Sequence, residues 1–269
     1  MNNKPLKNLT ICIKSGGDLA TGVAARLYKA GLKRLILLET ERPLAVRRNV
    51  SYAEAVYHGI QTVEGITARL CCSAEQFEDV FAAGEIAIIV DPQWSTLQQI
   101  SPDVVVDAIL AKRNIGTTMA EAPLVIGLGP GFDAGKDVHC IIETNRGHFL
   151  GSTIYSGPAQ PNTGAPGMIA GYTVERVLWS PTAGTFKTDH QIGDMIKQGE
   201  PFGFVDELPI PSKLDGVIRG LLRSETPVQE GTKLGDVDPR GEVAYCSLVS
   251  EKSRAIGGGV LEAILHNYL

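Results

Sequence analysis

Cysteine is scarce in this chain of 269 residues, and its cysteines are scattered. The five are Cys12, Cys71, Cys72, Cys140 and Cys246, an odd number with no CxxC spacing. The sequence also has no HExxH pattern. We therefore expect reduced thiols and no metal site built from this chain alone.

Long apolar runs and an excess of basic residues are also missing. No run approaches the roughly 20 apolar residues that a membrane-spanning helix needs, and residues 1–18 show no signal-peptide pattern. The net charge is -5 and the pI is about 5.6. These features argue against a nucleic acid or an anionic membrane as partner, and they predict a cytoplasmic globular protein.

Strand-like runs alternate with helical patterns through the first part of the chain. A β-branched run from Leu9 to Lys14 is followed by a glycine turn, a helical pattern ending at Gly31, and a second apolar run. This order predicts a βαβ unit. The second apolar run is the strand expected at 34–39, and further buried strands are expected at 66–72, 86–91, 103–108 and 123–128. We assign residues 1–157 to a Rossmann-like α/β domain with a parallel sheet.

Residues 172–240 contain an internal repeat at an offset of 32 residues. Gly184 recurs as Gly216, and Val205-Asp206 recurs as Val237-Asp238. The pattern predicts a small all-β module resembling the barrel-sandwich hybrid of lipoyl and biotinyl carriers. Lys213 lacks the flanking motif of such carriers, so neither biotin nor lipoate is expected. Residues 241–269 are predicted to form a strand and a helix that docks on the α/β domain.

The first candidate site is the turn from Ser15 to Gly22. Backbone N–H groups at a helix N-terminus after a glycine turn can bind an anion. Glu39 ends the second strand, where dinucleotide folds place a ribose-binding acid. The carboxylate of Asp18, however, would lie where a pyrophosphate binds in such folds, and Asp18 could equally be the N-cap of the helix. The candidate ligand residues here are Ser15, Gly16, Gly17, Asp18, Gly22 and Glu39.

The second candidate site is "GLGPGF", which follows the strand at 123–128. Gly127, Gly129 and Gly131 are more glycines than a plain turn needs, so we expect a ligand and a facing loop to approach their backbone. Nearby, Arg146 could clamp an anionic group, and His148 could act as an acid or base. The alternative for these two is a hairpin turn with solvated charges. No catalytic residue is assigned.

Five motifs together carry a resemblance to a known family. The chain resembles the YqeB-type accessory proteins of selenium-dependent molybdenum hydroxylases, relatives of XdhC-type molybdenum-cofactor chaperones. The resemblance implies a maturation role without requiring catalysis. The motifs are "IKSGGDLATGVAARLYKAG", "RPLAVRRNVSYAEAV", "VIGLGPGFDAGKDVHCIIETNRGH", "NTGAPG" and "RAIGGGVLEAIL".

Three functions therefore remain open from the sequence. The first is a maturation factor that binds a molybdopterin-type cofactor or a nucleotide at the carboxyl ends of the strands and serves a molybdenum hydroxylase client. The second is a nicotinamide-dependent oxidoreductase, which Glu39 favours and Asp18 disfavours. The third is a non-catalytic scaffold. The sequence leaves open whether the protein is a homo-oligomer.

Overall fold

A computed structural model describes residues 4–164 and 166–269. Met1–Asn3 of the expected first domain and Ala165 of the "NTGAPG" motif lie outside the described residues. The chain divides into two compact units. The first unit runs to Pro43 and also contains Ser51–Asn162 and Val249–Leu269, and the second contains Leu44–Val50 and Thr163–Leu248.

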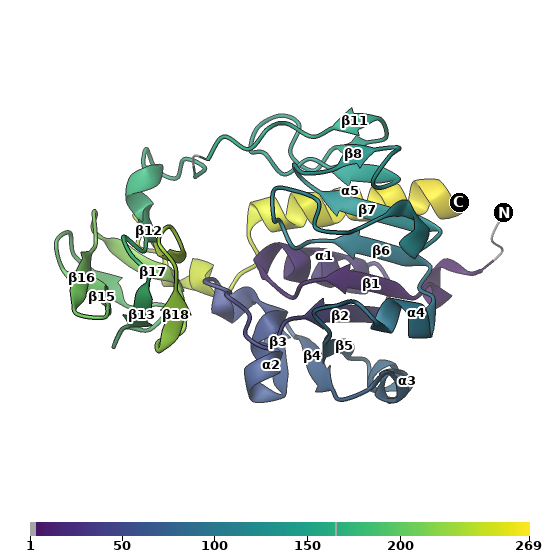
Figure 1. The fold of residues 1–269 in the computed structure, drawn as a ribbon, viewed down its shortest axis with the longest axis horizontal. Coiled ribbons are helices and arrows are strands. Elements are labelled where there is room, and N and C mark those ends of the chain that lie inside the picture. The colour runs from purple at the N-terminus through teal and green to yellow at the C-terminus, as the bar shows by residue number, and fades with distance from the viewer. Residues whose placement is uncertain (1–3, 165) are drawn as a thin grey trace. The chain divides into compact units, whose positions relative to one another are not determined.

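The first unit is built on one nine-stranded sheet (Figure 1). Its seven central strands are parallel, and the edge strands β3 and β10 are antiparallel to their neighbours. In spatial order the strands are β10 (Thr153–Ile154), β9 (Cys140–Ile142), β7 (Leu124–Leu128), β6 (Val104–Asp107), β1 (Ile11–Lys14), β2 (Leu35–Glu39), β5 (Ile86–Val90), β4 (Ile66–Cys71) and β3 (Ile60–Val63).

Helices cover both faces of this sheet. The α-helices are α1 (Asp18–Lys29), α2 (Ala55–His58), α3 (Phe77–Ala82), α4 (Thr96–Ile100) and α5 (Glu251–Tyr268). The C-terminal α5 lies beside α1 (Figure 1). Two short strands, β8 (Asp133–Ala134) and β11 (Gly157–Pro158), form a separate antiparallel pair. The 3-10 turns are Leu6–Asn8, Arg48–Val50, Tyr52–Glu54, Ala74–Gln76, Met119–Glu121, Val174–Arg176 and Val243–Cys246.

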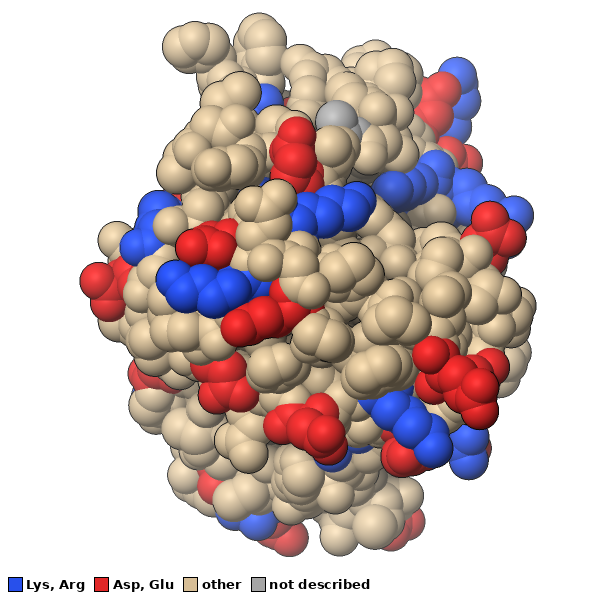
Figure 2. Space-filling model, turned by 90° about the vertical axis from the view of Figure 1, so that its left-hand side faces the viewer, with Lys and Arg blue, Asp and Glu red and all other residues tan. Residues whose placement is uncertain are grey.

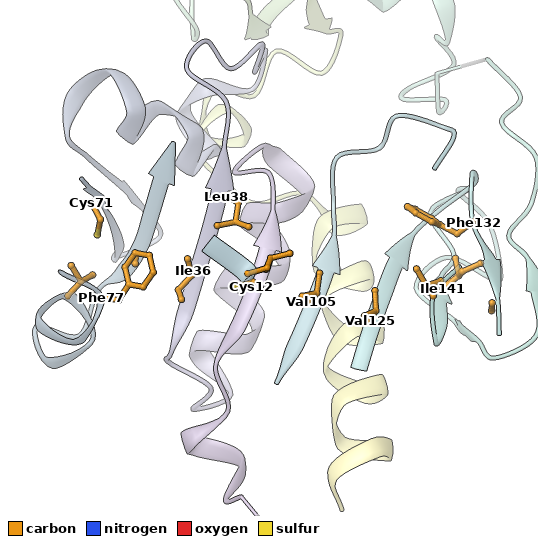
Figure 3. Packing of buried hydrophobic residues seen from close by; sticks show 14 of the residues in the cluster. Cys12, Ile36, Leu38, Cys71, Phe77, Val105, Val125, Phe132 and Ile141 are labelled. Atoms are coloured by element: carbon orange, nitrogen blue, oxygen red, sulfur yellow. The ribbon is translucent and has the colours of Figure 1, made fainter. Parts of the chain in front are cut away.

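Consecutive apolar residues explain why the central strands lie inside. A strand alternates its side chains between two faces, so a strand covered on both faces must be apolar throughout. Figure 3 shows one of these faces, where Cys12, Val105 and Val125 lie in a row on neighbouring strands. Phe77 of α3 and Phe132 pack in the same cluster. The alternate positions of the same strands face the opposite layer.

The second unit consists of two four-stranded antiparallel sheets. One has the order β12 (Val177–Trp179), β19 (Lys233–Asp238), β17 (Gly216–Leu221) and β14 (Met195–Ile196). The other has the order β16 (Leu208–Pro211), β15 (Pro201–Val205), β13 (Gly184–Lys187) and β18 (Thr226–Val228). An apolar cluster in this unit includes Phe186, Phe202 and Ile218. In the view of Figure 2, Lys and Arg side chains are interspersed with Asp and Glu.

The 32-residue repeat is visible in the strand pairing of the second unit. Phe186 of β13 lies opposite Val205 of β15, and Ile218 of β17 lies opposite Val237 of β19. Each residue of the second pair is 32 positions after its counterpart in the first.

The two copies also exchange short strands. Gly184 opens β13 and pairs with Val228, a residue of the second copy. Gly216 opens β17 and pairs with Ile196, a residue of the first copy. The two glycines therefore occupy equivalent positions, and neither copy completes its sheet alone.

The expected fold class is wrong. The large sheet is mixed, because β3 and β10 turn back along its two edges, and the second unit is a pair of antiparallel sheets. A parallel Rossmann-like domain with a barrel-sandwich-hybrid module does not describe this arrangement. The apolar runs predicted strands of the central sheet but neither antiparallel edge strand, because β3 is mostly exposed and β10 has only two residues.

The unit boundaries also differ from those drawn from the sequence. Residues 44–50 leave the first unit and belong to the second, where Leu221 N–H donates to Val46 O and Arg48 Nε donates to Leu221 O. In place of the strand expected after residue 240, the chain forms the 3-10 turn Val243–Cys246 and then α5.

Candidate functional site

The candidate site is the carboxyl edge of the large sheet, where β1 lies between β2 and β6. The chain leaves β1 toward β2 on one side and returns to β6 on the other, so the strand order reverses here. Ligands of open α/β sheets bind outside the carboxyl ends at such a reversal, because the connecting loops diverge there. Lys14 and Asp107 end the two strands and lie opposite each other.

Lys14 is fully buried at this point and is held by polar partners. Its Nζ donates to Thr117 Oγ1 at 2.7 Å and to Glu121 Oε1 at 2.9 Å, and it lies 3.6 Å from the centre of a Trp94 ring. Thr117 Oγ1 donates in turn to Asp107 Oδ2 at 2.6 Å. Burial lowers the pKa of the Lys14 amine, while Glu121 and Asp107 oppose that change. These residues form the Lys14 cluster.

The Lys14 cluster ties the loop after β6 to the centre of the sheet. Its polar groups are bonded to one another, which suits a rigid platform more than a reactive centre. The same loop carries Lys112 and Arg113, which are exposed and form no ion pair with any residue that the structure describes. Two cations are therefore available at this edge for an anionic ligand.

Glu39 shapes the glycine turn after β1. Its Oε2 accepts a hydrogen bond from Gly16 N–H at 2.7 Å, and its Oε1 accepts one from Thr40 N–H at 2.8 Å. The residue as a whole is only 8% exposed. The structure thus places Glu39 beside the turn, as expected, but both of its oxygens already bind backbone. Gly17, rather than Asp18, is the N-cap of α1.

Two glycines of the first motif have packing reasons. A Cβ on Gly16 would lie 2.8 Å from the Ala53 nitrogen, and a Cβ on Gly22 would lie 2.4 Å from Ser253 Cβ. Real Cβ atoms do not approach so closely. Gly16 and Gly22 therefore let α1 lie against the chain near Ala53 and against α5.

Asp18 and Arg146 meet at the start of α5. Asp18 Oδ1 accepts a hydrogen bond from Ser253 Oγ at 2.9 Å, and Arg146 forms an ion pair with Glu251. Lys252 lies between Glu251 and Ser253 in the chain. Burial lowers the pKa of its amine and the charge of Arg146 lowers it further, while Asp18 is among the acids that oppose this change.

Glu143 and His148 lie in the same turn after β9 but differ in their contacts. Glu143 is buried, and its two oxygens accept hydrogen bonds from the backbone N–H groups of Asn145 and Gln160. His148 is exposed and forms no hydrogen bond or ion pair with the described residues. The structure brings Arg146, but not His148, into a charged group.

Each glycine of "GLGPGF" has a neighbour where its side chain would be. A Cβ would lie 2.6 Å from the Phe132 ring at Gly127, 2.2 Å from Thr144 Oγ1 at Gly129 and 2.6 Å from the Arg113 nitrogen at Gly131. Gly129 and Gly131 also have φ of 72° and 116°. A facing loop does approach this turn, and the chain itself fills the space beside the three glycines.

Sequence reasoning missed most of the Lys14 cluster and the whole first turn of α5. A signal for the cluster was present, because Lys14 and Asp107 are charged residues that end strand-like apolar runs. Thr117, Glu121 and Trp94 carry no such signal. Among the described residues, no group of three or more His, Cys, Asp or Glu side chains could hold a metal ion. None of the described helices combines the length and apolar character needed to cross a membrane.

Comparison with known proteins gives one strong sequence likeness. The chain is 50% identical over 261 residues to "Uncharacterized protein YqeB" of Escherichia coli (strain K12), covering 97% of this chain and 48% of that protein. This likeness supports the YqeB part of the resemblance, but that name mentions neither molybdenum nor XdhC-type proteins. The chain spans about half the length of this curated relative. No protein-family model matches the chain.

Solved structures match only loosely. A succinylglutamate desuccinylase/aspartoacylase from Rhodobacter sphaeroides is 13% identical, with 85% of this chain and 84% of that one covered and a TM-score of 0.25. An aspartoacylase family protein from Mesorhizobium loti is 14% identical, with coverages of 86% and 85% and a TM-score of 0.26. At such TM-scores the likeness carries no argument about activity.

Proposed function

We propose that this chain binds a small anionic molecule at the carboxyl edge and serves as an accessory factor in the maturation of a molybdenum hydroxylase. The molecule is a molybdopterin-type cofactor or a nucleotide, handled as cargo. One observation carries the binding site: the strand order reverses between β1 and β6, and the loop beside that reversal carries the unpaired cations Lys112 and Arg113.

Charge and access at this edge support an anionic ligand. On one side lies the half-exposed turn containing Ser15 and Gly17, and on the other lies the loop with Lys112 and Arg113. Arginine and lysine bind phosphate oxygens by charge-assisted hydrogen bonds. Because the Lys14 cluster fixes the base of the loop, little conformational freedom of that base would be lost on binding.

The maturation role rests on the resemblance of the five motifs and on the character of the site. A carrier of a preformed cofactor needs a rigid binding surface and no reactive groups. The hydrogen bonds of Lys14 Nζ and Thr117 Oγ1 stay within the Lys14 cluster, which fits that requirement. The nicotinamide alternative is disfavoured because both oxygens of Glu39 already bind backbone N–H groups.

The direct test is to purify the protein from its own host and identify released small molecules by mass spectrometry. We expect a phosphate-bearing pterin or a nucleotide in near-stoichiometric amount. The double variant Lys112→Gln, Arg113→Gln should lose most of it. Lys7→Gln, an exposed residue before β1 at the opposite edge, is the matched control and should retain it. No ligand in the wild type would refute the binding site, and recovery of NAD or NADP would favour an oxidoreductase.

A second experiment tests the client. A molybdenum hydroxylase is produced in the same host with and without this chain, and its cofactor content and specific activity are measured. We expect both to fall together without the chain, because an unloaded enzyme lacks activity. Equal cofactor content in the two preparations would refute the maturation role while leaving the ligand site intact.

A further inference from the structure

Lys14 joins the centre of the sheet to the loop after β6 through a buried charge. Its side chain is fully buried, and its Nζ donates to Thr117 Oγ1 at 2.7 Å and to Glu121 Oε1 at 2.9 Å. The centre of a Trp94 ring lies 3.6 Å away, which makes a cation–π contact. All three contacts are stronger when the amine carries its proton, because charge-assisted hydrogen bonds exceed neutral ones and a neutral amine has no cation–π attraction.

Three titratable groups face this amine. Glu121 forms an ion pair with it, with Oε2 at 2.8 Å from Nζ, and Asp107 reaches it through the hydroxyl of Thr117. Cys12 lies on the same face of β1 and is the third group. Burial lowers the pKa of the amine, and these neighbours oppose that change. Loss of the proton would leave the two carboxylates without their buried counter-charge, which is costly.

A rigid turn connects Thr117 to the exposed cations of the loop. Asn114 Oδ1 accepts hydrogen bonds from Gly116 N–H and Thr117 N–H, both at 2.9 Å, and Asn114 Nδ2 donates to Thr117 O at 2.8 Å. Arg113 directly precedes this turn. A Cβ on Gly116 would lie 3.5 Å from Cζ3 of Trp94, so the turn also rests beside the ring that covers the amine. The position of Arg113 therefore depends on where Thr117 is held.

We infer that the charged form of Lys14 holds the loop after β6 in its anion-binding position, so that protonation of Lys14 and anion binding at Lys112 and Arg113 favour each other. This inference rests on the proposed function and adds to it the regulation of the same site. Without the proton, the hold on Thr117 weakens and the loop loses its fixed position. Anion affinity then falls as the pH rises through the pKa of Lys14, and by linkage a bound anion raises that pKa.

Trp94 supplies the readout, because the emission of an indole ring changes when a cation lies against it. The chain has two tryptophans, so Trp179→Phe leaves Trp94 as the only one. In this background the emission is titrated from pH 6 to 11 with sodium sulfate and with sodium chloride at equal ionic strength. Sulfate serves as the probe because its charge is constant over this range. Calorimetric titration with sulfate and with AMP measures binding directly.

We expect one transition in the emission, and sulfate should move it upward by about one pH unit, which corresponds to ten-fold weaker sulfate binding when Lys14 is neutral. Lys112→Arg should keep both the transition and the shift, which excludes the other amine of the loop as their source. The double variant Lys112→Gln, Arg113→Gln should keep the transition and lose the shift.

Two substitutions separate the charge from its connection to the loop. Lys14→Met should abolish the transition. Thr117→Val leaves the amine beneath Trp94 but removes its bond to the loop, so the transition should remain and the sulfate shift should disappear. Thr117→Ser restores the hydroxyl and should restore the shift, which a loss of stability alone would not explain. Thermal melting of each variant shows whether it folds.

The outcomes distinguish this inference from the proposed function. Sulfate binding without a shift, no transition between pH 6 and 11, or a full shift in Thr117→Val would overturn the inference alone. A transition that persists in folded Lys14→Met would do the same. A wild type that binds neither sulfate nor AMP and retains no ligand from its host would overturn the proposed function, and this inference with it.

Discussion

Alanine substitutions at three consecutive glycines of α5 are predicted to have opposite effects on stability. Glycine inside a helix costs roughly 0.5–1 kcal/mol relative to alanine. A Cβ on Gly258 would meet no atom within 4 Å, so Gly258→Ala should stabilise the fold by about that amount. A Cβ on Gly259 would lie 2.1 Å from Gly151 O, and one on Gly257 would lie 2.9 Å from Gly22 O.

The two contacting positions carry a steric cost that exceeds the helix gain. Overpacking of a well-packed interface costs about 1–3 kcal/mol. The contacts of Gly259 and Gly257 are to backbone carbonyls, which cannot rotate away. We therefore expect a net loss of about 1 kcal/mol or more at Gly259, a smaller loss at Gly257 and a gain at Gly258.

Differential scanning calorimetry measures the three effects on one scale. A change of 1 kcal/mol shifts the melting temperature by roughly 2–4 °C for a protein of 150–250 residues. Gly258→Ala should melt a few degrees higher than wild type, and Gly259→Ala should melt lower. The three variants share one helix and one chemical change, so only the surroundings differ. If Gly258→Ala melted as low as Gly259→Ala, the packing of α5 described above would be incorrect.

Two further predictions concern acid and the glycine turn. Burial raises the pKa of Asp236, but the charges of Lys233, Arg219 and Arg176 outweigh it, so the pKa lies below its ordinary 3.8. The unfolded chain then binds a proton that the folded chain does not, so the stabilisation is complete well above pH 3.8 and is lost progressively as the pH falls from there toward the lowered value. Urea unfolding between pH 5 and 2 should show this loss. The free energy of unfolding should fall less steeply with decreasing pH in Asp236→Asn than in the wild type, and an equal dependence in the two proteins would contradict the prediction. The second prediction is that Gly129→Ala costs more stability than Gly135→Ala. Both glycines have positive φ, but only at Gly129 would the new Cβ also meet another side chain, that of Thr144. Equal losses of stability in thermal melts would contradict the contact with Thr144.

The sequence carried most of the information about the central sheet and little about its edges. The run that ends at Lys14 and the helical pattern that ends before Gly31 predicted β1 and α1, because burial on both faces demands apolar residues at every strand position. β3 has only one buried residue and β10 has two residues in all. Such edge strands leave no periodic signal, and the parallel sheet was predicted without them.

The candidate site likewise has a part that the sequence predicts and a part that it does not. The turn around Ser15 was predictable because glycines directly follow a strand. The partners of its neighbours were not predictable, because they come from distant parts of the chain. Asp18 meets Ser253, 235 positions away, and Lys14 meets Thr117, 103 positions away. Only the fold brings these pairs together, and neither member of a pair signals the other.

The repeat in the second unit gives a last prediction, because equivalent positions need not have equal surroundings. A Cβ on Gly184 or on Gly216 would lie 2.8 Å from the valine of the facing strand, Val205 or Val237. The nearest atom differs: it is the carboxylate Oδ2 of Asp206 at 2.5 Å for Gly184, and the backbone oxygen of Asp238 at 2.4 Å for Gly216. A carboxylate can rotate away, whereas a backbone oxygen moves only with its strand. Gly216→Ala should therefore destabilise by about 1–3 kcal/mol, as overpacking does, and Gly184→Ala by clearly less. Urea unfolding of the two variants measures the difference, and a larger loss at Gly184 would show that side-chain freedom does not decide the cost.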